Sequence, residues 1–376
     1  MNRFLAIFIL TIGLCNSSGY SQEKKIYWSD GITPAIMRAN LDGSNIESIV
    51  TSDLVNPYEV IIDQRNFKLY WSDRGTKNIE RSNLDGSNRE IVISEFLDEP
   101  RGLAIDPISE KLFWVDFGTQ RIQKANLSDG SDIEIVVEDV ISEPHGIVID
   151  YENQKLYWTD RAAKKIQRSN LDGSNIETII STILENPAGI DLDVKNKRIY
   201  WTDSVADRIQ SANFDGTDIK TLITGLDTPF RIRLNLEEGK FYFTDLSLSV
   251  IGSANLDGSD YKLLIDSDEG LQGPTGLNFF NGRLINNLKD FSIKNLSIYP
   301  NPTKDFITLD LSSHFYLDES MVSIHNVLGN QIYSVQVKNL FKYRLELDVQ
   351  SFSNGIYFVE IISGGTIFKS NFFKID

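Results

Sequence analysis

Six aspartates, one at the end of each of six aromatic tetrads, are the first candidates for chemistry in this 376-residue chain. They are Asp30, Asp73, Asp116, Asp160, Asp203 and Asp245. Carboxylates that converge from a ring of repeats could bind a divalent ion. Each of them, however, occupies the same place in a framework motif, where a carboxylate accepts hydrogen bonds from backbone or polar groups between adjacent units. The sequence therefore predicts a structural role for these aspartates, and no metal site.

A second acidic motif, Asn-Leu-Asp-Gly-Ser, follows the tetrads, with variants that begin at Asn126 and Asn213. It has some likeness to a calcium loop, but one aspartate in a tight turn cannot supply the six or more oxygens that calcium requires. The glycine accepts a positive φ, and the Asp and Ser side chains bond the local backbone. The motif is therefore predicted to be a hairpin turn, and we expect no cofactor.

His145 is the single histidine between residues 24 and 280, so a Ser-His-Asp triad there would have to use it. It adjoins a proline, and we expect a solvent-facing loop residue. A hydrolase or lyase that uses a divalent ion would need Asp, Glu, Asn or His ligands converging on a central channel. No buried glutamate stands out in the strands expected to line that channel, such as Val60–Asp63. Such an enzyme is the alternative hypothesis.

Residues that differ between otherwise equal units are stronger candidates for a site. They directly follow a recurrent proline or a tetrad, and both places fall at the same end of every unit. Seven are predicted to form a binding face: Tyr58, Arg74, Arg101, Phe117, His145, Arg161 and Phe230. Aromatic and arginine side chains are enriched in recognition surfaces, and loops on a rigid scaffold commonly carry binding. Unselected variation of loops is the competing explanation.

The elements that would position these residues repeat with a period of about 43 residues. In the fourth copy we expect strands at Gly146–Asp150, Lys155–Thr159, Lys165–Asn170 and Ile176–Ile180. The adjacent Tyr and Trp of a tetrad require a strand buried on both faces, as in a sheet stacked between two similar sheets. Six units of four strands predict an all-β fold, a six-bladed β-propeller at residues 22–284.

Closure of the ring follows from the order of the motifs. The chain enters the repeats at Lys25–Asp30 without a preceding proline strand, and it leaves them with Thr275–Phe280, which no tetrad follows. We expect Thr275–Phe280 to be the innermost strand of the blade begun by Lys25–Val50, because this pairing would remove an open sheet edge. In the rival arrangement Arg283–Asn287 forms a local second strand, but its sequence is too polar for that buried position.

The tetrads, such as Tyr157–Asp160, together with their turns resemble the YWTD repeats, also called low-density lipoprotein receptor class B repeats. The resemblance covers about residues 24–280. Val115 and Phe243 depart from the pattern and are conservative for a packed strand. Propellers of this family bind proteins and are not enzymes, so the resemblance implies a binding protein, and we expect a protein or glycan ligand. The cysteine-rich modules of the receptors are missing from this sequence, so receptor biology is not implied.

After a polar linker at residues 285–295, residues 296–376 read as a small antiparallel β-sandwich with Asn-Pro, Leu-Gly-Asn and Asn-Gly turns. They resemble the type A C-terminal sorting domain of the type IX secretion system. The residues that carry the resemblance include Tyr299, Pro300, Asn301, Pro302, Gly329, Gly355 and Tyr357. The resemblance implies that the type IX secretion machinery is a partner, and that this domain is usually cleaved off. An ordinary accessory sandwich is the alternative.

Residues 1–21 read as a signal peptide, with Arg3 before the apolar run Phe4–Leu14. That run is too short for a transmembrane segment. Lipidation of Cys15, the single cysteine, is a further alternative. The net charge of −16 argues against nucleic acid and anionic membranes as partners. We therefore expect an exported protein, extracellular or on the outer-membrane surface of a Gram-negative bacterium.

Overall fold

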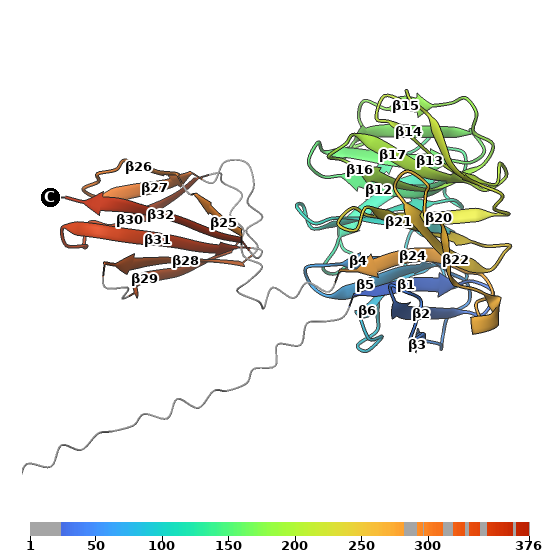
Figure 1. Cartoon of the computed structure of the whole chain (residues 1–376), viewed down its shortest axis with the longest axis horizontal. Coiled ribbons are helices and arrows are strands. Elements are labelled where there is room, and N and C mark those ends of the chain that lie inside the picture. Colours follow the sequence, from blue (N-terminus) through green and yellow to red (C-terminus); the bar gives the residue numbers. More distant parts are fainter. Residues whose placement is uncertain are drawn as a thin grey trace, which may run out of the picture. The chain divides into compact units, whose positions relative to one another are not determined.

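The chain contains two compact units, Glu23–Gly282 and a segment that includes Arg283–Asp376 (Figure 1). The computed structural model describes residues 24–281, 292–295, 297–310, 319–327, 331–338, 344–363 and 366–375. The predicted signal peptide, most of the predicted linker and Gly329 lie outside the described residues. Among the residues that are described, no helix is long and apolar enough to cross a membrane.

The first unit is a propeller of six four-stranded antiparallel sheets, which we number as blades 1 to 6. From the centre outward, blade 1 contains β24 (Pro274–Phe280), β1 (Lys25–Asp30), β2 (Ala35–Asn40) and β3 (Glu47–Val50). Blade 2 contains β4 (Pro57–Asp63), β5 (Lys68–Asp73), β6 (Asn78–Asn83) and β7 (Glu90–Ile93), and blade 3 contains β8 (Pro100–Asp106), β9 (Lys111–Asp116), β10 (Arg121–Asn126) and β11 (Glu134–Val137).

Blades 4 to 6 repeat this order. Blade 4 contains β12 (Pro144–Asp150), β13 (Lys155–Asp160), β14 (Lys165–Asn170) and β15 (Glu177–Ile180). Blade 5 contains β16 (Pro187–Asp193), β17 (Arg198–Asp203), β18 (Arg208–Asn213) and β19 (Lys220–Thr224). Blade 6 contains β20 (Pro229–Asn235), β21 (Lys240–Asp245), β22 (Val250–Asn255) and β23 (Lys262–Ile265), followed by the 3₁₀ helix η1 (Ser267–Glu269). The first strands contact one another in a closed ring, so they line the centre.

Blade 1 joins the two ends of the repeat region. β24 pairs with β1 in antiparallel register, with Lys25 opposite Phe280 and Trp28 opposite Leu277. Figure 1 shows the orange β24 beside the blue β1. The predicted interlock is therefore confirmed. The rival segment Arg283–Asn287 lies outside the described residues, and the position it would have taken beside β24 belongs to β1.

The tetrad strands are buried on both faces, as the sequence predicts. In blade 4, Tyr157 packs into a cluster shared with blade 5, which includes Trp201. The adjacent Trp158 packs into a cluster shared with blade 3, which includes Phe113. Full burial of a large apolar side chain contributes roughly 1.5–3 kcal/mol. The clusters between blades, rather than any core within a blade, therefore stabilise the propeller.

The six tetrad aspartates bind backbone N–H groups. Oδ2 of Asp160 accepts a hydrogen bond from the N–H of Ser142 at 2.8 Å, and Oδ1 accepts from Glu143 at 3.1 Å and from Ala163 at 3.0 Å. Ser142 and Glu143 lie in the connection that enters blade 4, and Ala163 lies in the turn after β13. The other five aspartates make the equivalent bonds. Each carboxylate thus fastens a connection between blades to its own blade.

The glycine of each Asn-Leu-Asp-Gly-Ser turn makes a contact between blades. Gly173 in blade 4 has a φ of +82°, and a Cβ built there would lie 1.8 Å from the carbonyl oxygen of Val136 in blade 3. The equivalent glycines approach the preceding outer strand in the same way, and Gly43 closes the series against Leu264 of blade 6. Asp172 orders the turn by accepting bonds from the following serine. Glycine is required here both for its φ and for the space.

The second unit is a sandwich of two sheets. The five-stranded sheet has the order β25 (Ser292–Asn295), β32 (Thr366–Lys374), β31 (Gly355–Ser363), β28 (Glu319–Asn326) and β29 (Gln331–Lys338). The three-stranded sheet has the order β26 (Ser297–Tyr299), β27 (Phe306–Asp310) and β30 (Arg344–Asp348). One buried cluster joins them, with Leu309 and Leu347 from the smaller sheet and Val359 and Phe372 from the larger. β25 lies within the segment predicted to be a linker, where it pairs in parallel with β32 and extends the larger sheet.

The predicted sorting residues that are described lie at joints of this unit. Oδ1 of Asn301 accepts a bond from the N–H of Phe373 at 2.9 Å, and its Nδ2 donates to the carbonyl of Asn371 at 3.2 Å. These bonds tie the turn between β26 and β27 to β32 of the other sheet. Tyr357 is buried, and its hydroxyl donates to the carbonyl of Ser353 at 2.7 Å. Tyr299 ends β26, Pro300 and Pro302 flank Asn301, and Gly355 begins β31.

We expect Gly173→Ala to lower the free energy of unfolding more than Gly225→Ala does. Both glycines have a positive φ, where a left-handed conformation costs an alanine about 1–2 kcal/mol. A Cβ at Gly225 has no described atom within 4 Å, whereas at Gly173 it meets the carbonyl of Val136. Urea unfolding of the full chain measures both variants. Equal losses would contradict a role of the turn in packing between blades.

Candidate functional site

The innermost strands begin one to three residues earlier than predicted. β12 starts at Pro144 rather than at Gly146, and β4 starts at Pro57. A shift of register follows the proline in each case, between Pro144 and Ile147 in blade 4. The residues after these prolines are therefore strand residues near the centre of the propeller, and not residues of an outer loop.

Three rings from alternate blades meet at one end of the central channel. Tyr58 comes from blade 2, His145 from blade 4 and Phe230 from blade 6. Every pair is in edge-to-face contact, with centroids 5.5 Å apart for Tyr58–His145, 5.4 Å for Tyr58–Phe230 and 4.8 Å for His145–Phe230. All three side chains are buried. We call these three rings the aromatic plug, and the end of the channel that they close the channel mouth.

The expectation of a solvent-facing His145 is wrong, because the residue lies inside β12 and is 0% exposed. Its Nδ1 lies 3.1 Å from Nη1 of Arg231, which can only donate, so Nδ1 is the acceptor. Burial, followed by the charges of Arg231, Arg161 and Arg101, holds the pKa of His145 well below its usual range. The ring is therefore neutral, and its Nε2–H donates to the Tyr58 hydroxyl at 2.5 Å.

The second residue after the proline is glycine in four blades, and a charged side chain in the other two. A Cβ at Gly146 would lie 2.4 Å from the carbonyl oxygen of Ala188 in the next blade, so the innermost strands pack closely at this level. Blades 2 and 6 carry Glu59 and Arg231 there, each about 1% exposed. The expectation that no buried glutamate lines the channel is therefore wrong. Glu59 was missed because the predicted strand began at Val60.

Glu59 of blade 2 and Arg231 of blade 6 form a buried ion pair, which joins the two blades on either side of blade 1. Nε of Arg231 lies 2.9 Å from Oε2 of Glu59. The contact is ionic and not a hydrogen bond, because the Nε–H bond does not point at the carboxylate. Nη2 of Arg233 lies 3.5 Å from the other carboxylate oxygen. One buried carboxylate therefore faces two guanidinium groups, directly below the aromatic plug.

Tyr58 is surrounded by guanidinium groups. The Cζ atoms of Arg74, Arg231 and Arg101 lie 5.0, 5.4 and 5.7 Å from the centroid of its ring. Contacts of this kind are attractive, because the face of an aromatic ring carries negative charge. Arg101 also lies over Phe117, with Cζ 3.9 Å from the ring centroid. Cations and aromatic rings thus alternate across the channel mouth.

Two glutamates compensate part of this charge. Arg101 forms ion pairs with Glu143 at 3.3 Å and with Glu99 at 3.4 Å. Nη1 of Arg161 lies 3.7 Å from the same Glu143. The Nε atoms of Arg74 and Arg161 donate to the side-chain oxygens of two asparagines, Asn56 and Asn186.

The seven residues that the sequence singled out lie around one end of the channel, at two depths. Tyr58, Arg101, His145 and Phe230 are buried, and Arg74, Phe117 and Arg161 are partly exposed. Sequence reasoning missed Glu59, Arg231, Asn56 and Asn186. The sequence did contain a signal for Glu59 and Arg231, since they occupy the position at which the other four blades have glycine. Within the described residues, no three His, Cys, Asp or Glu side chains are grouped so that they could hold a metal ion.

Six segments of the chain match the low-density lipoprotein receptor repeat class B, at residues 24–64, 68–107, 110–151, 154–194, 197–232 and 239–277. Together they cover more than half of the chain. The chain belongs to the low-density lipoprotein receptor class B repeat family. Residues 297–374 match the secretion system C-terminal sorting domain. This class B repeat protein is therefore exported to the cell surface or beyond it.

Solved structures share the propeller fold of this chain. A chain in the crystal structure of a nidogen/laminin complex has a TM-score of 0.62 and 23% identity, over 69% of this chain and 99% of that chain. The streptogramin B lyase structure has a TM-score of 0.52 and 15% identity, over 67% of this chain and 82% of that chain. At these identities the similarity establishes the fold alone. A search of curated proteins found no match.

We expect Glu59→Gln to lower the free energy of unfolding of this class B propeller by about 3–5 kcal/mol, because it leaves buried arginine charge without its partner. Glu47→Gln is the matched control, since it breaks an exposed ion pair with Arg38 and should cost about 1 kcal/mol or less. A double variant, Glu59→Gln with Arg231→Gln, should recover part of the loss. Urea unfolding compares the variants. Equal stability of Glu59→Gln and Glu47→Gln would contradict the role of the buried Glu59–Arg231 pair in the stability of the propeller.

Proposed function

We propose that the protein is an exported binding protein whose channel mouth recognises a protein or a glycan. The observation that carries this proposal is the cluster of arginines and aromatic rings around Tyr58. It gathers side chains from blades 2, 3, 4 and 6 at one end of the channel, at positions that differ between the repeats. Arginine and aromatic residues in well-packed surroundings dominate the energetics of many interfaces. The parts that are alike in every blade serve packing instead.

Two further features support binding rather than catalysis. The aromatic plug closes the channel at the end where these side chains gather. His145, the histidine that a catalytic triad would need, is buried, with Nδ1 facing Arg231 and Nε2 facing Tyr58. The lyase shares the fold, so the fold by itself favours neither function. The nidogen/laminin structure is that of a complex between two proteins, which supports recognition as a use of such propellers.

The route to the outside is part of the proposal. Residues 1–21 act as a signal peptide, residues 22–284 form the propeller, residues 285–291 form a linker, and the sorting domain extends from β25 at Ser292 to residue 376. The sorting domain would engage the type IX secretion machinery and place the propeller on the outer surface of a Gram-negative bacterium or in the medium. The family match of residues 297–374 supports this assignment.

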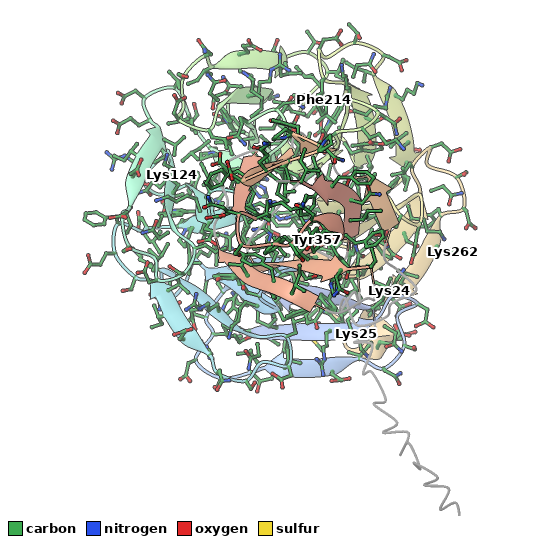
Figure 2. The ribbon with its side chains drawn as sticks, turned by 90° about the vertical axis from the view of Figure 1, so that its left-hand side faces the viewer. Lys24, Lys25, Lys124, Phe214, Lys262 and Tyr357 are labelled. Atoms are coloured by element: carbon green, nitrogen blue, oxygen red, sulfur yellow. The ribbon has the colours of Figure 1, made fainter. Side chains whose placement is uncertain are left out.

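A capture experiment tests the channel mouth. The full chain is immobilised and exposed to envelope extract and culture medium of the producing bacterium. We expect Arg74→Gln with Arg161→Gln to lose most of the material that the wild type retains, without a change in melting temperature, because both side chains are partly exposed. Lys124→Gln with Lys262→Gln removes the same charge at the periphery of the propeller and is the control (Figure 2). Equal retention by the two double variants would count against the proposal.

Deletion of Leu296–Asp376 tests the route. We expect the truncated chain to stay inside the cell or in the periplasm, because it lacks the sorting domain. Fractionation of cells and medium, followed by immunoblotting, measures its distribution. A stability measurement on the truncated chain shows whether loss of export reflects misfolding of the propeller. Normal appearance of the truncated, folded propeller on the cell surface would refute the route.

A further inference from the structure

The channel mouth carries more positive charge than its own carboxylates balance. Three guanidinium groups, those of Arg74, Arg101 and Arg161, share the carboxylates of Glu99 and Glu143. Arg74 is the group left over, because no carboxylate of a described residue lies within 4 Å of its guanidinium nitrogens. The whole chain, in contrast, has a net charge of −16. A local positive excess in an acidic protein marks a place where an anion is attracted.

The two partly exposed arginines are held in fixed orientations. Nε of Arg74 donates to Oδ1 of Asn56 at 3.0 Å, and its guanidinium lies over the Tyr58 ring. Nε of Arg161 donates to Oδ1 of Asn186. The asparagines occupy only Nε, so they leave both Nη atoms of Arg74 available, and Nη2 of Arg161, whose Nη1 faces Glu143. A guanidinium fixed in this manner loses less conformational entropy when it binds a carboxylate in the bidentate fashion.

The electrostatics of neighbouring groups agree with this excess. Burial lowers the pKa of Arg161, Tyr58 and Glu143 oppose that effect, and the charges of Arg101 and Arg74 lower the pKa further. These like charges therefore act on one another. Below them, Nη2 of the buried Arg231 has no hydrogen-bond acceptor among the described residues. The repulsion is relieved when a negative group enters from outside.

We infer that the channel mouth binds one oxyanion group, a carboxylate, through the terminal nitrogens of Arg74 and Arg161. This inference rests on the proposed function, since it names the chemistry of the group that the same face recognises. The carboxylate comes either from a small free anion or from a pendant group of a larger ligand. It sits on the aromatic plug and not inside the channel, because the three rings below are buried and in mutual contact.

The overall charge of the chain restricts the kind of ligand. A polyanion would meet the repulsion of a protein with a net charge of −16 wherever it extended beyond the channel mouth. A ligand with a single carboxylate, otherwise neutral or cationic, meets the local excess without that penalty. The structure therefore assigns to this face a monoanionic group rather than a sulfated or phosphorylated chain.

Titration of the full chain with sodium acetate tests this inference. The reference is sodium chloride at equal ionic strength, and acetamide is the neutral analogue. We expect acetate, and not acetamide, to raise the melting temperature, since a ligand that binds the folded state stabilises it by mass action. Arg74→Gln with Arg161→Gln should abolish the shift, and Lys124→Gln with Lys262→Gln should keep it. Arg74→Lys with Arg161→Lys keeps the positive charge but removes the planar guanidinium that binds a carboxylate in bidentate fashion. We expect this variant to show a smaller rise in melting temperature with acetate.

A competition readout separates this inference from the proposed function. Acetate is added to the wild-type chain after capture of material from envelope extract. Release of that material, together with a shift that depends on Arg74 and Arg161, supports a pendant carboxylate. If acetate raises the melting temperature but does not release the captured material, the site binds a free anion. That result overturns the part of the inference in which the carboxylate-binding site takes part in ligand capture. Absence of the shift in the wild type overturns the inference altogether, while loss of capture in the double glutamine variant would still support the binding face.

Discussion

Each tetrad strand is apolar on both of its faces, and the rest of the propeller depends on this constraint. Tyr157 and Trp158 enter different clusters, so blade 4 requires blade 3 and blade 5 to bury them. The other regular features of the repeat serve the same contacts. The tetrad aspartate fastens the incoming connection, and the turn glycine lets the hairpin approach the preceding outer strand. A stack of this kind has no natural end, so it is stable only as a closed ring.

Most of this architecture could be predicted from the sequence, because the same motifs recur in six repeats. Bilateral burial follows from an adjacent Tyr and Trp, and the number of blades follows from the number of tetrads. Even the interlock of β24 with β1 follows from the order in which the motifs begin and end. The contact made by Gly173 could not be predicted, because a turn with a positive φ reads the same whether or not a carbonyl oxygen lies beside it.

The site was harder to predict, because the burial of its residues depends on where the innermost strands begin, to within two or three residues. With β12 beginning at Gly146, His145 would have been a loop residue, and with β4 beginning at Val60, Glu59 would have stayed outside the channel. The actual strands begin at the prolines, so both residues turn inward. The pairing of Glu59 with Arg231 joins blades that are not adjacent in sequence, and no periodic pattern announces such a contact. The signal for these two residues in the sequence was that they replace the glycine found at the same position in the other four blades.

The pairing of Lys25 with Phe280 has a consequence for the synthesis and folding of the chain. The strands of blade 1 that are synthesised first stay without their inner partner until residues 274–280 have been made. Pairing over such a separation is slow, since loop closure must precede the contacts that reward it. The sorting domain follows the closing strand, so any chain that carries the export address also carries the strand that completes the ring. A chain that terminates before residue 274 therefore lacks both the closing strand and the sorting domain.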